Sequence, residues 1–200
     1  MSDDMQLNEH KQPAETGLEI AVLGSARLKE NDAWWACAHQ LGALLAQGGY
    51  VIVTGGYAGL MAAASRGAHE AGGRVIGLPM QHWTGIAPNP WNADLRWSTN
   101  YGTRLNYILH CDAVIALPGG VGTLSEMAVV WSAIQTEGRA LPLVLLGDCW
   151  LPVIKAVREN LVVSDVDLNL LRFATSPEEA VRELQAGLQD KERIGPGPRG

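Results

Sequence analysis

Short apolar runs alternate along the chain with longer stretches in which apolar residues recur at helical spacing. The apolar runs predict strands over 18–23, 50–54, 74–78, 113–117 and 143–146, and a short edge strand over 172–174. The longer stretches predict helices over 34–45, 60–71, 101–110, 123–136, 150–159 and 177–189. This alternation is typical of repeated βα units. We therefore expect a single-domain, Rossmann-like α/β fold, in which a parallel sheet is flanked by helices in three layers.

One long segment, 79–100, breaks this alternation. It contains three tryptophans, Trp83, Trp91 and Trp97, together with several prolines, and it shows no regular period. We interpret it as an ordered loop that covers a site. The tryptophans suit two roles, stacking on a nucleobase or anchoring the loop to the core or to a subunit interface, and the sequence leaves both open.

Length and composition are those of one globular domain with a small-molecule partner. The 200 residues are 47% hydrophobic and carry a formal net charge of −6, which does not suit a surface that neutralises nucleic acid. We expect the folded domain over 17–190, with flexible tails over 1–16 and 191–200, which lack apolar periodicity. No long apolar run predicts a membrane span. The three dispersed cysteines fit a reducing cytoplasm.

Glycine-bearing turns follow the strands predicted over 18–23, 50–54 and 113–117. The carboxyl ends of parallel strands share one edge of a sheet, where free backbone N–H groups and helix amino termini suit a phosphate. A lone glycine turn is more often a plain connection, but three at one edge favour a phosphate site. The candidate phosphate-binding residues are Gly24, Ser25, Gly55, Gly56, Gly59, Pro118, Gly119, Gly120, Gly122 and Thr123.

Two familiar phosphate motifs are absent from the sequence. A P-loop requires GxxxxGK[ST], and the dinucleotide fingerprint requires GxGxxG in the first βα turn. The nearest match has Gly120 and Gly122, but Ser125 stands where the third glycine belongs. ATP hydrolysis and NAD-dependent dehydrogenation are therefore disfavoured. The histidines lack metal-helix spacing, so we expect no bound metal and no cofactor. His82 and His110 are weak acid–base candidates.

The string PGGVGTLSE, 118–126, resembles the PGGxGTxxE signature of the LONELY GUY family, whose members include cytokinin riboside 5′-monophosphate phosphoribohydrolases. TGGYAGLM, 54–61, is similar to that family's GGGxxGLM segment, and AVLGSA, 21–26, to its opening strand and turn. Of the family's Arg-Lys pair this chain keeps Arg104, followed by Leu105. That segment is closer to a broader branch of the superfamily, which contains molybdenum-cofactor carrier proteins. The resemblance implies a homodimer with sites near the subunit contact.

Glu126 and Arg104 are the candidate catalytic residues. By spacing alone, 123–126 also forms a capping box, in which Glu126 returns to the start of its helix; the resemblance instead implies a catalytic glutamate. Arg104 suits a phosphate or the leaving base, and its alternative is a structural pair with Asp94 or Asp112. A group of apolar residues on the helices fits core packing first, and the resemblance gives it a second role at a dimer contact. Its members are Leu60, Met61, Met127, Val130, Trp131 and Ile134.

The sequence thus predicts an enzyme that hydrolyses a nucleoside 5′-monophosphate to free base and ribose 5-phosphate. The alternative is a non-catalytic carrier that uses the same loops for a nucleotide or a phosphorylated pterin. A nucleotide sensor that acts through a protein partner ranks last, because no segment is dedicated to such a partner.

Overall fold

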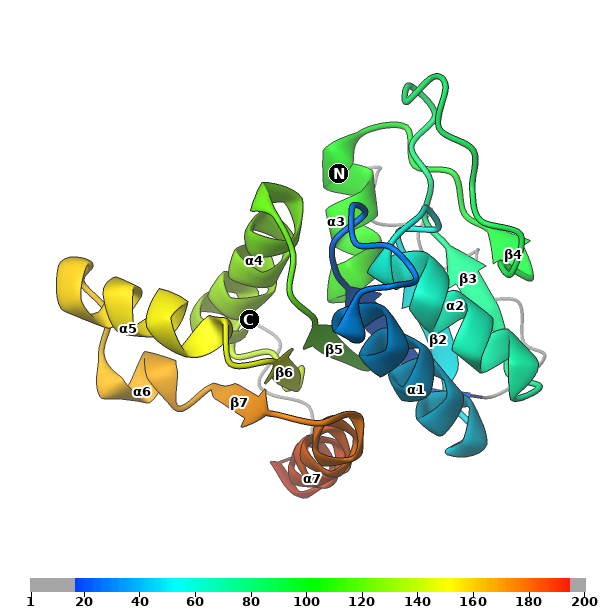
Figure 1. Ribbon diagram of the computed structural model, residues 1–200. Coiled ribbons are helices and arrows are strands. Elements are labelled where there is room, and N and C mark those ends of the chain that lie inside the picture. The colour runs from blue at the N-terminus through cyan, green and yellow to red at the C-terminus, as the bar shows by residue number, and fades with distance from the viewer. Residues whose placement is uncertain (1–16, 195–200) are drawn as a thin grey trace, which may run out of the picture.

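A computed structural model describes residues 17–194, and its centre is one parallel sheet (Figure 1). Seven strands lie in the order β4-β3-β2-β1-β5-β6-β7, and every neighbouring pair is parallel. The strands are β1 (Glu19–Leu23), β2 (Val51–Thr54), β3 (Val75–Gly77), β4 (Asp94–Leu95), β5 (Ala113–Ala116), β6 (Leu143–Leu146) and β7 (Leu171–Ala174). The helices are α1 (Ala33–Gln47), α2 (Leu60–Glu70), α3 (Tyr101–Leu109), α4 (Val121–Glu137), α5 (Trp150–Asn160), α6 (Asp165–Leu168) and α7 (Pro177–Ile194). The predicted Rossmann-like α/β fold is confirmed.

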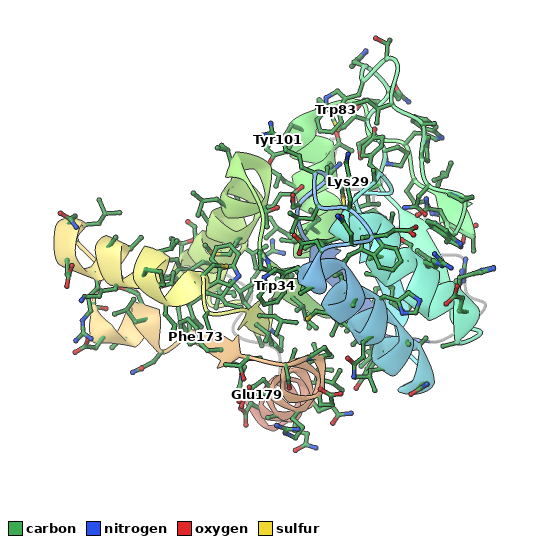
Figure 2. The ribbon with its side chains drawn as sticks, in the orientation of Figure 1. Lys29, Trp34, Trp83, Tyr101, Phe173 and Glu179 are labelled. Atoms are coloured by element: carbon green, nitrogen blue, oxygen red, sulfur yellow. The ribbon has the colours of Figure 1, made fainter. Side chains whose placement is uncertain are left out.

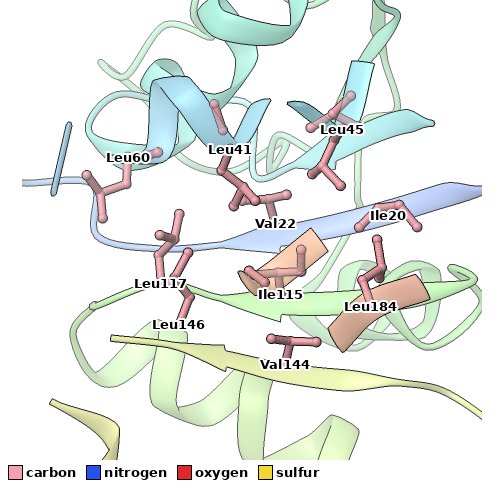
Figure 3. Packing of buried hydrophobic residues seen from close by; sticks show 14 of the residues in the cluster. Ile20, Val22, Leu41, Leu45, Leu60, Ile115, Leu117, Val144, Leu146 and Leu184 are labelled. Carbon is pink, nitrogen blue, oxygen red and sulfur yellow. The ribbon is translucent and has the colours of Figure 1, made fainter. Parts of the chain in front are cut away.

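Both faces of the sheet are covered, because side chains alternate along each strand. Ile20 and Val22 of β1 pack with Leu41 of α1 and Leu184 of α7 in the core on one face (Figure 3). The intervening Ala21 and Leu23 pack in the other core with residues of α3, α4 and α5. The result is three layers, with α1, α2 and α7 on one side and α3, α4 and α5 on the other (Figure 1).

Helices α1 and α2 touch backbone to backbone. A Cβ added at Gly42 would lie 2.0 Å from the carbonyl oxygen of Ala64, and one at Gly67 would lie 1.9 Å from that of His39. Real Cβ atoms do not approach this closely, so this crossing depends on glycine at both positions.

Two short elements depart from the sequence-based assignment. The segment expected to be irregular contributes β4, because Asp94 and Leu95 pair with β3 at Ile76 and Gly77. The short helix α6 precedes β7 and begins at Ser164, whose side chain closes a capping box with Asp167.

The domain also ends later than expected. Helix α7 continues to Ile194, so residues 191–194 are helical and do not belong to the flexible tail predicted over 191–200. After Pro177, which begins the helix, no proline occurs before Pro196, and the one internal glycine, Gly187, does not end the helix. The predicted flexible segment 1–16 and residues 195–200 lie outside the described residues. None of the helices in the described part is long and apolar enough to cross a membrane.

The chain reverses its direction across the sheet at β1. From β1 it moves outward through β2, β3 and β4, and then returns to β5 on the other side of β1. The loops that follow β1 and β5 therefore lead away in opposite directions. Ligands of open α/β sheets bind at such a switch point. The glycine turns after β1 and β5 both lie there.

Candidate functional site

The glycine turns meet at the carboxyl edge of the sheet. Ser25 donates its backbone N–H to the carbonyl of Pro118, at 3.1 Å, and its own carbonyl accepts from the N–H of Leu60, at 2.8 Å. Gly24 fits between Leu60 and Leu117, because a Cβ there would lie 3.0 and 3.3 Å from their Cβ atoms. Ser25 thus joins the turn after β5 to the start of α2, as the sequence predicts for a shared edge.

Glycine is required at Gly59 by both conformation and space. Its φ is 70°, and a Cβ would lie 2.2 Å from the carbonyl oxygen of Ser25. Gly56 also has a positive φ, of 79°, but its polar groups are engaged within the protein. Its N–H donates to Oγ1 of Thr54, at 3.0 Å, and its carbonyl accepts from the N–H of Asn89, at 2.7 Å. Gly56 therefore holds the turn to the 79–100 segment instead of presenting its amide to a ligand.

The turn after β5 is the open part of the site. Gly119, Gly120 and Gly122 are exposed, and no atom lies within 4 Å of a Cβ added at Gly120 or Gly122. No side chain caps α4 at Gly120. Within the described residues, no acceptor faces the backbone N–H groups of residues 121–123. An amino terminus in this state suits an anion. Thr123 is buried and supports the turn, since a Cβ at Gly119 would lie 2.1 Å from its Oγ1.

The capping-box interpretation of residues 123–126 is wrong. Helix α4 begins at Val121 with Gly120 as its N-cap, so Thr123 lies inside the first turn. Glu126 falls beyond the position from which a side chain can return to the cap. It turns inward and pairs with Arg104 of α3.

Arg104 and Glu126 form a buried ion pair, and only 7% of each side chain is exposed. Nε and Nη2 of Arg104 donate to Oε1 of Glu126 at 3.1 and 2.9 Å, and Nη1 donates to the carbonyl of Leu78 at 3.2 Å. Oε2 of Glu126 accepts no hydrogen bond from the described residues. It is also not one of their fully buried atoms that lack a partner, so it keeps some contact with solvent. Oε1 is therefore bound by Arg104, whereas Oε2 remains available to a water molecule or a substrate.

The pKa of Glu126 is raised above its ordinary value of 4.5, because burial disfavours the charged carboxylate. The neighbouring Arg104 opposes this shift through its charge and its hydrogen bonds. A carboxylate with a raised pKa beside an open anion site suits proton transfer. The predicted alternative partners of Arg104 are engaged elsewhere: Asp94 binds Arg74, and Asp112 accepts from the backbone N–H of Glu19.

Gly55 and aromatic side chains surround Arg104. A Cβ at Gly55 would lie 2.6 Å from Nη2 of Arg104, so glycine there makes room for the guanidinium. The ring of Trp83 lies 5.8 Å from Cζ of Arg104 and stacks on Tyr57 at 5.5 Å. The hydroxyl of Tyr57 accepts from the backbone N–H of Met80, at 2.7 Å. Trp83 remains 46% exposed, so it lies at the mouth of the site rather than in the core.

Tyr101 is a site residue that sequence reasoning missed. Its hydroxyl lies 3.0 Å from Oγ of Ser125, the residue before Glu126, and so links the start of α3 to α4. Figure 2 shows Tyr101 and Trp83 at the same end of the molecule. Only the adjacency of Ser125 to Glu126 hinted at this contact, because nothing in the sequence pairs α3 with α4.

The histidine candidates lie away from this pair. His110 is the C-cap of α3, and its Nδ1 lies 2.7 Å from the carbonyl oxygen of Asn106, so it completes the helix end. His82 is exposed on the 79–100 segment. Within residues 17–194, no group of three or more His, Cys, Asp or Glu side chains is placed to hold a metal ion.

The apolar helix surface that suggested a dimer is used within the chain. Met127, Val130 and Ile134 are buried against the sheet, and Nε1 of Trp131 donates to the carbonyl of Asp167, at 2.9 Å. Leu60 and Met61 are buried as well. Core packing, the first role predicted for these residues, is thus confirmed. The homodimer stays a prediction from the family resemblance, and light scattering checks it.

The substitution Gly122→Ala tests phosphate binding at the α4 amides separately from the stability of the fold. The added methyl group meets no protein atom within 4 Å, so the free energy of unfolding is expected to change by less than about 1 kcal/mol. Because Cβ atoms in a helix lean toward its amino terminus, the methyl group is expected to crowd a phosphate on these amides. If the site binds a nucleoside 5′-monophosphate such as AMP, the affinity should fall about tenfold, roughly 1.4 kcal/mol. Calorimetric titration and urea unfolding measure the two quantities. Unchanged AMP affinity would mean that no phosphate lies at Gly122.

Several known proteins are similar to this chain in sequence or in fold. An uncharacterized protein of Archaeoglobus fulgidus is 35% identical over 115 residues, which cover 56% of this chain and 72% of that protein. The cytokinin riboside 5′-monophosphate phosphoribohydrolase LOG4 of Arabidopsis thaliana is 25% identical over 189 residues, 89% of this chain and 86% of that protein.

Among solved structures, the molybdenum cofactor binding protein of Rippkaea orientalis matches with a TM-score of 0.68 and 27% identity. The match covers 86% of this chain and 97% of that protein. The model of the SLOG cluster4 family matches residues 17–163, from β1 past the end of α5 and through both halves of the candidate site. The chain belongs to the SLOG cluster4 family.

Proposed function

We propose that this protein hydrolyses the N-glycosidic bond of a nucleoside 5′-monophosphate, releasing the free base and ribose 5-phosphate. The observation that carries the proposal is the juxtaposition on α4 of open amides at 121–123 and the carboxylate of Glu126. The two are separated by about one helical turn, roughly 5 Å. A ribose 5-phosphate can span such a gap with its phosphate at the amides and its anomeric carbon near the carboxylate.

Each residue then has a defined task. The amides of α4 bind the 5′-phosphate and orient the ribose. Oε2 of Glu126 accepts a proton from water as that water attacks the anomeric carbon, and the negative charge stabilises the oxocarbenium-like transition state. The bond from the anomeric carbon to the base nitrogen breaks, its electron pair goes to that nitrogen, and the nitrogen takes up the proton that Glu126 accepted from water, so the carboxylate is restored. Arg104 holds Oε1, so the carboxylate stays oriented.

Two further observations support a hydrolase. LOG4 of Arabidopsis thaliana is named for phosphoribohydrolase activity on a cytokinin riboside 5′-monophosphate, and the match to it spans 89% of this chain. The exposed ring of Trp83 beside Arg104 offers a stacking surface where the leaving base would lie.

The test is to incubate the protein with a panel of purine and pyrimidine nucleoside 5′-monophosphates and to measure by chromatography the free base that is released. Each nucleoside without phosphate is the matched control, because it lacks the group that the α4 amides bind. Turnover of a monophosphate and not of its nucleoside supports the proposal. Equal turnover of both, or turnover of neither, contradicts it.

The dependence of kcat/KM on pH provides an independent prediction. Protonated Glu126 cannot accept a proton, so kcat/KM is expected to fall as the pH drops through the pKa of Glu126. Because burial raises this pKa, the midpoint of the acidic limb should lie above 4.5. Arg104→Met removes the charge that opposes the shift and should move the midpoint to higher pH. A midpoint at or below 4.5, or one that Arg104→Met leaves unchanged, would argue against Glu126 as the base.

A second candidate function is a carrier of a phosphorylated pterin. The specific observation is the structural match to the molybdenum cofactor binding protein of Rippkaea orientalis, with a TM-score of 0.68. The open α4 amides would bind the phosphate of such a ligand as they would that of a nucleotide. The test is pterin fluorescence after acid oxidation of protein purified from a host that makes the cofactor. Pterin at about one per chain, with no base release, would favour the carrier.

A further inference from the structure

A groove of about 330 Å³ includes residues of the first two glycine turns in its lining, and Glu126 does not line it. Its floor includes Ala26, Ala58 and Gly59. Ala26 follows Ser25, whose backbone binds both Pro118 and Leu60, and a Cβ at Gly59 would meet Ser25 and Ala26. The groove therefore begins where the proposed phosphate site ends. Its small floor residues let a ligand approach the backbone closely.

One wall of the groove is aromatic. Trp35 of α1 and Trp91 of the 79–100 segment both line it. Cζ of Arg66 lies 5.7 Å from the ring of each tryptophan, so one guanidinium holds both indoles in place. Arg66 is fixed in turn by Glu70, whose Oε1 accepts from its Nε at 2.7 Å. His39 also stacks on Trp35, with ring centroids 5.6 Å apart. Both indoles are thus held in place, and their partly exposed surfaces offer an aromatic wall for a planar ring.

The loop between β1 and α1 brings positive charge to the groove. Arg27 and Lys29 line the groove from the loop between β1 and α1, and both are exposed. Neither side chain forms an ion pair within the described part of the chain. Glu30 also lines the groove, and its carboxylate is paired with Arg66. In a chain of net charge −6, two unpaired cations facing a groove favour an anionic occupant.

We infer that this groove is a second binding site, which takes a planar aromatic group bearing a phosphate. The ring stacks against Trp35 and Trp91, and the phosphate contacts Arg27 and Lys29. A ligand of this chemistry has two possible sources. It is either the distal half of a dinucleotide whose near phosphate occupies the α4 amides, or a separate nucleotide. The site does not depend on hydrolysis by Glu126.

Calorimetric titration with AMP and with diadenosine pyrophosphate, whose halves are both AMP, distinguishes the two sources. The variant is Arg27→Ala/Lys29→Ala, and the matched control is Lys155→Ala/Arg158→Ala, which removes exposed cations of α5 outside this groove. For a dinucleotide, we expect one site per chain and about tenfold tighter binding than AMP. The groove variant should remove this advantage without changing AMP affinity, and the control should retain it.

For a separate nucleotide, we expect two AMP sites per chain in the native protein and one in the groove variant. The inference is overturned if the Arg27→Ala/Lys29→Ala change weakens the binding of neither probe, or if the α5 control weakens it equally. Base release from AMP, measured on the same preparations, reports separately on the proposed hydrolase. Groove-dependent binding without base release would retain this site and reject that activity.

Discussion

Glu126→Gln is expected to lower the rate of base release about 10²- to 10⁴-fold, the usual contribution of a positioned acid–base group. The substitution keeps the size of the side chain and an acceptor oxygen for Arg104, but it removes the carboxylate that activates water and opposes the positive charge of the transition state. The phosphate site is formed by backbone amides of α4, so the affinity for AMP should change little. Single-turnover assays and calorimetric titration measure the two quantities.

The same variant also leaves Arg104 buried without a counter-charge, which costs stability. Thermal unfolding must therefore show that the variant is folded at the assay temperature. Glu126→Asp is the companion variant. It keeps the negative charge, but its side chain is one methylene group shorter, so the carboxylate lies farther from the attacking water. If folded Glu126→Gln protein releases base at the native rate, Glu126 is not the catalytic base, and the proposed role of this carboxylate is rejected.

Gly67→Ala is expected to destabilise the fold by about 3 kcal/mol or more, the upper range for overpacking a well-packed core. The added methyl group would lie 1.9 Å from the carbonyl oxygen of His39, and a backbone atom in the middle of α1 cannot move aside without separating the two helices. Because a domain of this size is stable by about 5 to 15 kcal/mol in total, the loss should be large in urea unfolding.

Gly102→Ala in α3 is the matched control. Asn100 Oδ1, at 3.2 Å, is the nearest atom to the added methyl group, and glycine lowers helix propensity. The control should therefore be neutral or stabilise the protein by up to about 1 kcal/mol. Equal urea midpoints for the two variants would mean that α1 and α2 are not in backbone contact in solution.

The order of strands and helices was readable from the sequence, because hydrophobic periodicity reflects which side chains are buried. The runs 143–146 and 113–117 coincide with β6 and β5 to within a residue at either end. The glycine turns were recognisable for the same local reason: a strand followed by glycine and a helix places backbone amides at one sheet edge. Where only a two-residue strand forms, as in β4, the local signal was too weak, since β4 exists through its pairing with β3.

Only the tertiary structure decided what the charged side chains do. Arg104 and Glu126 are 22 residues apart on different helices, and their pairing depends on how α3 and α4 pack. Locally, Glu126 resembled a capping residue, and this interpretation failed because α4 begins two residues earlier, with a glycine cap. Likewise, Trp35 and Trp91 come together on Arg66 only because the 79–100 segment folds back over α1 and α2. Sequence patterns record burial and local geometry, whereas the partners of a buried charge are set by contacts between elements.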